Sequence, residues 1–426
     1  MVRTITRSIF FVCLVMPLFT LHAGADSAKT KRGLNTAAQS ELSAAGVDKY
    51  LGEFTPTSGE DVGGGWTRHT FDTEGGDGPI CIEGDPYSVL TKAGDPKKLL
   101  IFLQGGGACW QGFYNCSRTA NDGARPPFGV FDATEAGNPF ADYSIVYLPY
   151  CDGSAFGGDN DVSDAEFSGG TRYHRGVRNQ SAGMDVAGDM FPRAKQVTVM
   201  GHSAGGVGVA AFAPFLTRYV FGNNIKLTVF NDAGPIAVNL GTGKPPGNGA
   251  PFFGCADTAC FSLVARAFDW QFAKFYPQSC IDDGRCDAFG QQTGIIDWRL
   301  ENDATIREAF YETDSDGTNR FFAQGDGTLM DPEVYRELIL TEHGAIHDKY
   351  PRRYKRFIVS ADDTHGGVQG TASSNCFPYP QPFLFYTQEA NGELLNEWTR
   401  EFVRIGSRQS QFGWQDIVED YTPVDC

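Results

Sequence analysis

One segment of the chain, Gly201-His202-Ser203-Ala204-Gly205, places a serine between small residues. A strand-like apolar stretch precedes this segment, and an apolar, helix-like stretch from Val207 to Tyr219 follows it. A sharp strand-to-helix turn of this kind exposes a serine hydroxyl as a nucleophile, and the flanking small residues prevent clashes. We therefore predict that Ser203 is a nucleophile; the alternative is an incidental serine in a glycine-rich turn. Pro214 is expected to kink or shorten the helix.

Acyl transfer to a serine also requires N–H groups that bind the oxyanion of the tetrahedral intermediate. The backbone N–H of Ala204, directly after the serine, is one expected donor. A second donor is expected from a glycine-rich loop after an earlier strand, and Gly105-Gly106-Gly107 directly follows the apolar run Leu99–Leu103. We predict an oxyanion hole made by Gly106, Gly107 and Ala204. A nucleotide-binding loop would need other glycine spacing or a following Gly-Lys-Ser/Thr.

A histidine that follows the serine in the chain is expected to be the general base. The histidines in this part of the chain are His343, His347 and His365. His343 and His347 have the spacing of helical metal ligands but lack the glutamate of the HExxH motif, so we expect a solvated helix face. His365 lies in a Gly- and Asp-rich turn after the run Phe357–Ser360, and it is the predicted base. His202 is expected to project away from the serine.

An acidic residue should hold the imidazole in the correct tautomer. The possible strand Glu308–Thr313 ends in the turn Asp314-Ser315-Asp316-Gly317, between the serine and the histidine. Asp316 is our first choice for the acid and Asp314 the alternative, with Asp232, which follows another strand, as a rival. The same turn is acidic enough for calcium, but the later ligands of a calcium loop are missing. We predict that the site uses no metal and no cofactor.

Short apolar runs of strand length recur along the chain, with helical or loop segments between them. They are continuous rather than alternating, which is typical of strands buried on both faces in a parallel sheet. Each ends in a Gly- or Asp-rich turn, where folds of this class bind their ligands. The predicted fold class is α/β, a mostly parallel sheet with helices on both faces. The runs are Leu99–Leu103, Ser144–Leu148, Val197–Met200, Leu227–Phe230 and Phe357–Ser360.

The chain begins with Arg3 and Arg7, then an apolar run from Ile9 to Leu21 and the small residues Ala23–Ala25. This pattern predicts a secretory signal peptide over residues 1–25, with an uncleaved anchor as the alternative. The apolar run is too short for a spanning helix and no later segment approaches that length, so no transmembrane segment is expected. The protein is predicted to be secreted, either extracellular or periplasmic.

The cysteines and the charge agree with export. The chain has 11 cysteines; Cys13 lies in the predicted signal peptide, which leaves 10. An even number in an exported chain indicates disulfides, up to five of them. Close spacing favours the pairs Cys109/Cys116, Cys255/Cys260 and Cys280/Cys286. The chain lacks a CxxC pair with matching partners, which disfavours a zinc site. The net charge of −17 disfavours nucleic acid and anionic membranes as partners.

We expect one catalytic domain over residues 61–426, preceded by a partly ordered lead-in over residues 26–60. The segment from about 235 to 298 interrupts the α/β pattern, because it is rich in Gly and Pro and holds four cysteines. It is interpreted as a cysteine-rich, cap-like insertion near the site, or alternatively as a surface elaboration. The chain shows no internal repeat and no low-complexity linker.

With these motifs placed, the chain resembles the pectin acetylesterase family, which includes the Wnt-deacylating hydrolase Notum. The block Tyr150–Asp159 is long and unusual, and it is therefore more specific than the serine turn. The matching blocks are Gly105–Trp110 with Cys116, Tyr150–Asp159, Ser203–Gly206 and Asp232–Gly234.

The resemblance implies an α/β-hydrolase fold, a Ser-Asp-His triad and an oxyanion hole from the Gly106–Gly107 loop and Ala204. The family acid falls at Asp316, with a polar partner at Asn319, and the family histidine at His365. The resemblance also implies that the Asp-Ala-Gly segment is part of the site wall, which disfavours Asp232 as the acid of the triad.

The chain departs from the plant members of this family in three places. The implied fold and triad are unaffected by these departures, whereas the identity of the substrate is not implied. The serine turn reads Gly-His-Ser instead of Gly-Cys-Ser, and the glycine loop continues Ala-Cys-Trp where Trp-Cys is usual. Thr364 and Gly366 replace cysteines beside His365.

The predicted function is hydrolysis of carboxylic esters through an acyl-enzyme, with acetyl groups on an extracellular polysaccharide as the substrate that the resemblance implies. A negatively charged protein is poorly suited to polyanionic pectin, unless a basic groove exists, for example around Arg172, Arg175 and Arg178. The alternatives are a lipase-like or other acyl-ester hydrolase acting on a non-pectin substrate, and a non-catalytic carbohydrate-binding protein with the same fold. Nothing in the sequence indicates an oligomeric state.

Overall fold

The computed structural model describes residues 33–72, 76–234, 267–286, 292–324, 328–369, 384–404 and 413–424. The predicted signal peptide, the Cys255/Cys260 pair and most of the expected insertion lie outside these ranges.

The strands in the first half of the described chain are β1 (Ser58–Gly63), β2 (Trp66–Thr70), β3 (Ser88–Lys92), β4 (Asp95–Leu103), β5 (Gly107–Trp110), β6 (Phe113–Cys116), β7 (Tyr143–Leu148), β8 (Asn160–Ser163) and β9 (Thr171–His174). Those in the second half are β10 (Gln196–His202), β11 (Lys226–Asp232), β12 (Arg307–Thr313), β13 (Tyr354–Val359), β14 (Glu389–Ala390), β15 (Glu393–Leu394) and β16 (Ile417–Val418).

The helices are α1 (Thr36–Ala44), α2 (Gly176–Met190), α3 (Ala204–Ala211), α4 (Ala213–Phe221), α6 (Gln278–Asp282), α7 (Gln292–Asn302), α8 (Gly317–Gln324), α9 (Pro332–Lys349), α10 (Leu384–Thr387) and α11 (Leu395–Val403). Two short 3-10 helices, η1 (Gly129–Phe131) and η2 (Phe272–Phe275), complete the described elements.

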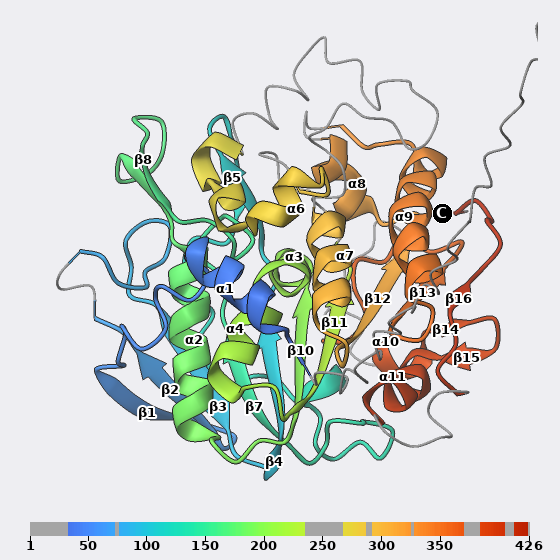
Figure 1. Ribbon diagram of the computed structural model, residues 1–426, viewed down its shortest axis with the longest axis horizontal. Coiled ribbons are helices and arrows are strands. Elements are labelled where there is room, and N and C mark those ends of the chain that lie inside the picture. The colour runs from blue at the N-terminus through green and yellow to red at the C-terminus, as the bar shows by residue number, and fades with distance from the viewer. Residues whose placement is uncertain are drawn as a thin grey trace, which may run out of the picture. The chain divides into compact units, whose positions relative to one another are not determined.

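The largest sheet runs in the order β1-β2-β3-β7-β4-β10-β11-β12-β13-β16 (Figure 1). From β7 to β16 every neighbouring pair is parallel, whereas β1, β2 and β3 add an antiparallel edge. The five predicted apolar runs all lie in parallel strands of this sheet, as does Glu308–Thr313, which falls within β12. The predicted α/β class with a mostly parallel sheet is therefore confirmed.

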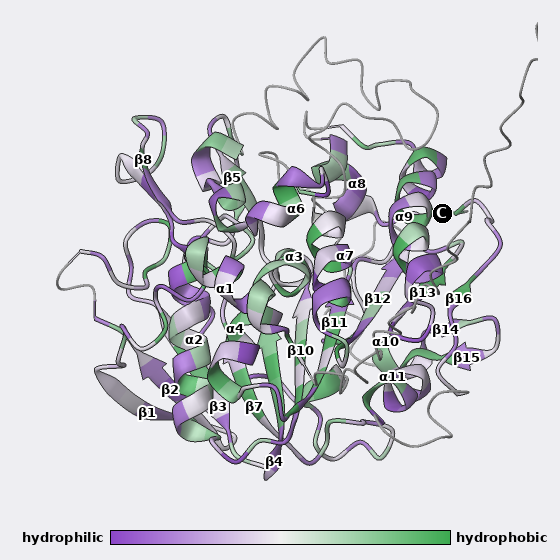
Figure 2. Ribbon diagram, in the orientation of Figure 1, coloured by the Kyte–Doolittle hydropathy of each residue, from purple (hydrophilic) through white to green (hydrophobic). Residues whose placement is uncertain are grey.

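The continuous apolarity of these strands follows from helices on both faces of the sheet. In β4, Leu99, Ile101 and Leu103 pack into one hydrophobic cluster, with residues of α1, α2, α3, α4, α7 and α9. The alternate residues Leu100 and Phe102 pack into a second cluster, with residues of η1, α10 and α11. Because successive side chains of a strand point to opposite faces, a strand covered on both sides has no polar face. Figure 2 shows this hydrophobic centre.

The predicted helix after the serine turn is broken into α3 and α4 at Phe212, and the two pieces are bent by 53°. Pro214 occupies the first turn of α4, where a missing N–H costs nothing. The break is therefore the one that the sequence predicts. In the part of the chain that the structure describes, no single helix is long and apolar enough to cross a membrane; α3 and α4 meet that test only as a bent pair.

Three disulfides lie within the described residues. Cys109–Cys116 joins β5 to β6, and Cys280–Cys286 closes a short loop at α6. Both pairs are predicted from their spacing. Cys81–Cys151 is not, because the two residues are 70 positions apart.

The expectation that His343 lies on a solvated helix face is wrong. His343 is 1% exposed and points from α9 onto the sheet, where its ring stacks on Phe310 at a centroid distance of 3.7 Å. Its Nδ1 bonds the hydroxyl of Tyr354, whereas Nδ1 of His347 bonds the Tyr354 carbonyl. Both histidines are thus part of the packing between α9 and β13.

Candidate active site

Ser203 lies at the turn between β10 and α3 with a strained backbone, φ 54° and ψ −120°. Positive φ is costly for a residue with a Cβ and is characteristic of functional sites. The glycines on either side permit the turn. A Cβ on Gly201 would lie 2.1 Å from the Gly205 carbonyl oxygen, and a Cβ on Gly205 would lie 2.1 Å from that of Leu103. The Ser203 N–H donates to the Asp232 carbonyl at 2.8 Å, which ties the turn to β11.

The loop Gly105–Gly107 leaves β4 beside this serine. A Cβ on Gly105 would lie 2.7 Å from Cβ of Ser203, so the loop backbone touches Ser203. Gly107 has φ +76° and begins β5. Ala204 is the first residue of α3, and the first amides of a helix have no acceptor within the helix. The start of the glycine loop and the first turn of α3 therefore both lie at Ser203.

The block Tyr150–Asp159 packs against the glycine loop. The ring of Tyr150 lies where a side chain on Gly106 would have to go, with its Cδ1 2.4 Å from the position of a Cβ. The Tyr150 hydroxyl accepts the backbone N–H of Ala155 at 3.0 Å, and both Ala155 and Phe156 have positive φ. The Cys81–Cys151 disulfide anchors the start of the block. The block thus fixes the position of the loop that approaches Ser203.

His365 reaches the serine turn across two intervening strands. It follows β13, which is separated from β10 by β11 and β12, a span of about 14 Å at the usual strand spacing. The loop after β13 returns far enough that the rings of His365 and His202 have centroids 4.8 Å apart. Gly366 has φ +75°, and a Cβ there would lie 2.1 Å from Cε1 of His202. The glycine after His365 therefore allows the loop to close on the residue before Ser203.

The structure brings Asp316, and not Asp314, to His365. Oδ2 of Asp316 lies 2.6 Å from Nδ1 of His365, and Asn319 donates its backbone N–H to Oδ1 at 2.7 Å. Asp314 instead accepts hydrogen bonds from Arg336 at 2.6 Å and from Ser360 at 2.7 Å. The two carboxylates of the turn are thus bonded to different groups.

The protonation of the pair follows from its burial. Burial lowers the pKa of His365 to about 4, while the charge of Asp232 acts in the opposite direction. The imidazole is therefore neutral at pH 7. Asp316 accepts the N–H of Nδ1, which leaves Nε2 with a lone pair. Burial also raises the pKa of Asp316, against hydrogen bonds from Asn319 and Glu312 that favour its ionised form. A neutral imidazole with a free Nε2 can accept a proton.

Asp232 has a role that the sequence motifs do not reveal. Its Oδ1 accepts the N–H of Gly367 at 2.9 Å, and its Oδ2 accepts that of Val368 at 3.3 Å. Oδ2 also lies 3.1 Å from Nδ1 of His202. This fully buried carboxylate therefore holds the loop of His365 against the serine turn. His202, which we expect to project away from Ser203, connects the serine turn to the loop of His365. The Asp-Ala-Gly segment is a signal for the site wall, but not for this contact.

The basic groove suggested around Arg172, Arg175 and Arg178 is not present. Arg172 is fully buried and is ion-paired with Asp164 and Asp269. The other two arginines are also bonded to acidic residues, Arg175 to Asp161 and Arg178 to Asp159 at 2.7 Å. These arginines neutralise acidic residues of neighbouring segments, so they provide no free positive surface for a polyanion.

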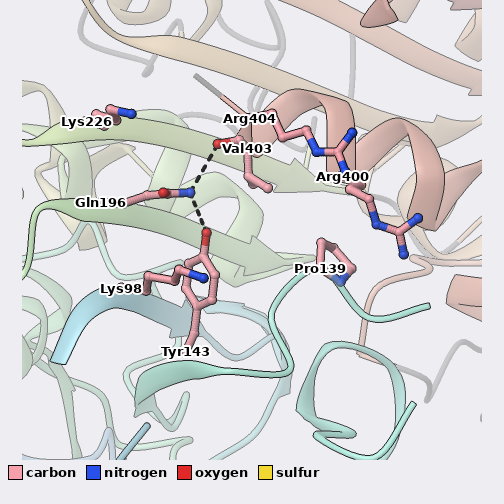
Figure 3. A pocket seen from close by; sticks show the side chains of 8 residues that line it. All are labelled: Lys98, Pro139, Tyr143, Gln196, Lys226, Arg400, Val403 and Arg404. Atoms are coloured by element: carbon pink, nitrogen blue, oxygen red, sulfur yellow. Dashed lines mark hydrogen bonds between the residues drawn. The ribbon is translucent and has the colours of Figure 1, made fainter. Parts of the chain in front are cut away.

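A cavity of about 440 Å³ lies toward the amino-terminal ends of the central strands (Figure 3). Lys98, Gln196 and Lys226 line it from the amino-terminal parts of β4, β10 and β11, whereas Ser203 and His365 follow the carboxyl ends of their strands. Three of its four cations, Lys98, Arg400 and Arg404, form ion pairs with Asp142, Glu397 and Glu401. The cavity is therefore separate from the candidate active site. Among the described residues, no group of three or more His, Cys, Asp or Glu side chains is arranged to hold a metal ion.

Comparison with known proteins gives one family. Residues 70–237 match the family model described as pectinacetylesterase. The matched region holds the glycine loop, the Tyr150–Asp159 block, Ser203 and Asp232, whereas Asp316 and His365 lie beyond it. A search of curated proteins found no match. The family acts on acetyl esters, so the match supports a carboxylic ester hydrolase. Over residues 70–237 the chain is therefore similar to the pectinacetylesterases, and the mostly parallel sheet agrees with that similarity.

Proposed function

We propose that this protein is a secreted serine esterase that removes acetyl groups from an extracellular polysaccharide. The observation that carries the proposal is the 2.6 Å bond between Asp316 and His365, made by a loop that closes on the strained turn of Ser203. The disulfides support export, because disulfides persist in oxidising compartments.

In the proposed mechanism, Oγ of Ser203 attacks the ester carbonyl carbon while Nε2 of His365 takes the hydroxyl proton. The oxyanion of the tetrahedral intermediate binds to N–H groups of the Gly106–Gly107 loop and of Ala204. Asp316 stabilises the imidazolium. Collapse of the intermediate breaks the bond to the alcohol, which leaves with the proton from Nε2. Water, deprotonated by the same histidine, then attacks the acyl-enzyme and releases acetate.

The charge distribution favours a neutral acetylated glycan over a polyuronide. The chain carries a net charge of −17, and the arginines that would form a basic groove are paired with carboxylates. Like charges repel at long range, which lowers the rate of encounter with a polyanion. A neutral acetylated polysaccharide avoids this repulsion.

An aromatic cluster at the start of β6 favours the second candidate, hydrolysis of esters with a longer acyl chain. Phe113 is half-buried and stacks on Trp110 with a centroid distance of 4.2 Å. Phe321 and Phe322 of α8 approach Phe113 at 5.7 and 5.8 Å. These aromatic residues come soon after residues of the proposed site in the chain. Trp110 and Phe113 follow the glycine loop, and α8 with Phe321 and Phe322 follows Asp316. Trp110 and Phe322 are buried, whereas the half-buried rings of Phe113 and Phe321 suit contact with an acyl chain as well as with a sugar ring.

The test is hydrolysis of p-nitrophenyl acetate by the wild type and by Ser203→Ala, both checked for folding by circular dichroism. We expect activity in the wild type and none above the uncatalysed rate in the variant; equal activity in both would remove the serine assignment. Acetate release from neutral and from uronic acid-rich acetylated polysaccharides, compared with cleavage of long-chain esters, then distinguishes the two candidate substrates.

A further inference from the structure

A second buried carboxyl group, Glu312, lies behind Asp316. Glu312 is the penultimate residue of β12 and is 0% exposed. Its Oε1 accepts the backbone N–H of Thr313 at 3.0 Å. Its Oε2 accepts the Tyr335 hydroxyl and the amide group of Asn319, both at 2.9 Å. The proposed mechanism gives this carboxyl no task.

Glu312 and Asp316 are joined by a shared donor. Nδ2 of Asn319 donates to Oε2 of Glu312 at 2.9 Å and to Oδ2 of Asp316 at 3.1 Å, so one amide group bridges them. This bridge places the two carboxyl groups next to each other. One can donate a hydrogen bond to the other only if it carries a proton.

The groups around Glu312 and Asp316 favour one proton shared between the two carboxyl groups. The groups that face it from the neighbouring elements are Asp232 of β11, Tyr311 of β12, Tyr335 of α9 and His365. None of these is a lysine or an arginine, and His365 is neutral at pH 7. Two buried carboxylates in contact without a cation do not both ionise.

The hydrogen bonds place that proton on Glu312. Asp316 accepts N–H groups at both oxygens, from Asn319 at Oδ1 and from His365 and Asn319 at Oδ2. The bonds to Asp316 from His365 and from the Asn319 backbone, at 2.6 and 2.7 Å, are shorter than the three bonds to Glu312, at 2.9–3.0 Å. Shorter bonds are typical of an ionised acceptor, so they favour the ionised form of Asp316. Burial, and after it the charge of Asp316, raise the pKa of Glu312 well above its ordinary value.

We propose that Glu312, as a neutral carboxylic acid, is a positioning residue that donates its O–H to Asp316 and so keeps Asp316 ionised and directed at Nδ1 of His365. The proposal rests on the proposed function of Ser203, Asp316 and His365. The proton stays on Glu312 throughout the reaction, and no bond of Glu312 to the substrate is formed.

The experiment compares Glu312→Gln, which keeps a neutral donor of nearly the same shape, with Glu312→Leu, which removes the donor. In Glu312→Leu, the buried Asp316 loses a hydrogen bond to its charged form, and its pKa rises. We expect the acid limb of kcat/KM to move about one to two pH units upward and kcat at pH 7 to fall about 10-fold to 100-fold. Glu312→Gln should keep the wild-type acid limb and at least about one tenth of the activity.

A purely structural role would lower the melting temperature and the amount of active protein without moving the acid limb. An unmoved limb in Glu312→Leu, or a limb that moves equally in both variants, would overturn the proposal. Failure of the proposed function looks different, because wild type and Ser203→Ala would then have the same activity.

If Glu312→Leu does not fold, infrared difference spectra of the wild type and Glu312→Gln still test the proposal. The wild type at pH 7 should show the C=O band of a protonated, buried carboxylic acid, and Glu312→Gln should lack it. Persistence of that band in Glu312→Gln would place the proton elsewhere and overturn the assignment.

Discussion

Replacing Asp316 with asparagine exchanges one oxygen for an NH₂ group, and the structure determines where that group must lie. Oδ1 accepts the backbone N–H of Asn319 at 2.7 Å, so the amide oxygen of the new residue has to stay at that position. The NH₂ group then replaces Oδ2 and faces Nδ1 of His365 across 2.6 Å. Two donors cannot bond each other, so Nδ1 must become an acceptor and the proton moves to Nε2.

That tautomer cannot accept the proton of Ser203. In serine hydrolases with a Ser-His-Asp triad, the same exchange lowers kcat by about 10⁴. We expect a loss of this size here, equivalent to about 5.4 kcal/mol in the activation barrier. The measurement is kcat/KM for p-nitrophenyl acetate at pH 7, with circular dichroism and thermal unfolding to show that the variant folds.

Asp314→Asn is the matched control, because Asp314 is in the same turn but bonds Arg336 and Ser360. It should lose about 1–3 kcal/mol of stability, since the bond to a charged guanidinium is weakened, and keep its activity within about tenfold. The reasoning is refuted if folded Asp316→Asn keeps more than about a tenth of the wild-type activity, or if folded Asp314→Asn loses as much as Asp316→Asn.

The other predictions concern the disulfides, the pH profile and the glycine loop. Removing the Cys81–Cys151 disulfide by a double alanine substitution should cost about 4 kcal/mol of unfolding free energy, against about 2.5 kcal/mol for Cys109–Cys116, because the residue separations are 70 and 7; urea unfolding measures both, and an equal or reversed order contradicts the entropic reasoning. Because burial lowers the pKa of His365 to about 4, the base stays neutral on acidification, so kcat/KM should stay flat from pH 7 to about pH 5 and decline below it; a decline centred at the ordinary value of 6.5, in protein shown to be folded, would be inconsistent with the buried imidazole. Gly105→Ala would place a methyl group 2.7 Å from Cβ of Ser203, so displacement of the oxyanion loop should lower kcat about 10²-fold to 10³-fold; an unchanged kcat would show that the loop is not needed.

The sequence directly predicts the parallel strands and the candidate site at their carboxyl ends. A strand packed by helices on both faces has no polar face, so runs such as Leu99–Leu103 stand out from their surroundings. The turn of Ser203 is equally local, because its glycines and the following helix are adjacent in the chain. These features depend on neighbours a few residues away, which a single sequence contains.

Features that depend on distant neighbours are harder to predict. Asp314 and Asp316 occupy one turn and have the same chemistry, and only the packing of the turn on the loop of His365 distinguishes them. The sequence allows Arg172 to be part of a basic groove, but its partners Asp164 and Asp269 come from separate segments and neutralise it.

The interior of the fold gives the same lesson. The spacing of His343 and His347 puts them on one helix face, which we expect to be solvated, yet α9 turns His343 onto Phe310. Cys81 and Cys151 meet only because the sheet brings β3 and β7 together as neighbours. Glu312 lies in a strand whose residues are all buried, and its side chain is bonded by Asn319 and Tyr335, which lie on helices further along the chain.

The order of the three reactive groups along the chain has a consequence for when activity can arise during synthesis. Ser203 is made first, Asp316 much later and His365 later still, and the loop of His365 is held by Asp232 through Gly367 and Val368. In the proposed mechanism, a nascent chain or a proteolytic fragment that ends before residue 365 has a nucleophile with no base to activate it. Hydrolysis by the proposed triad therefore requires the chain to be made and folded at least through the loop of His365.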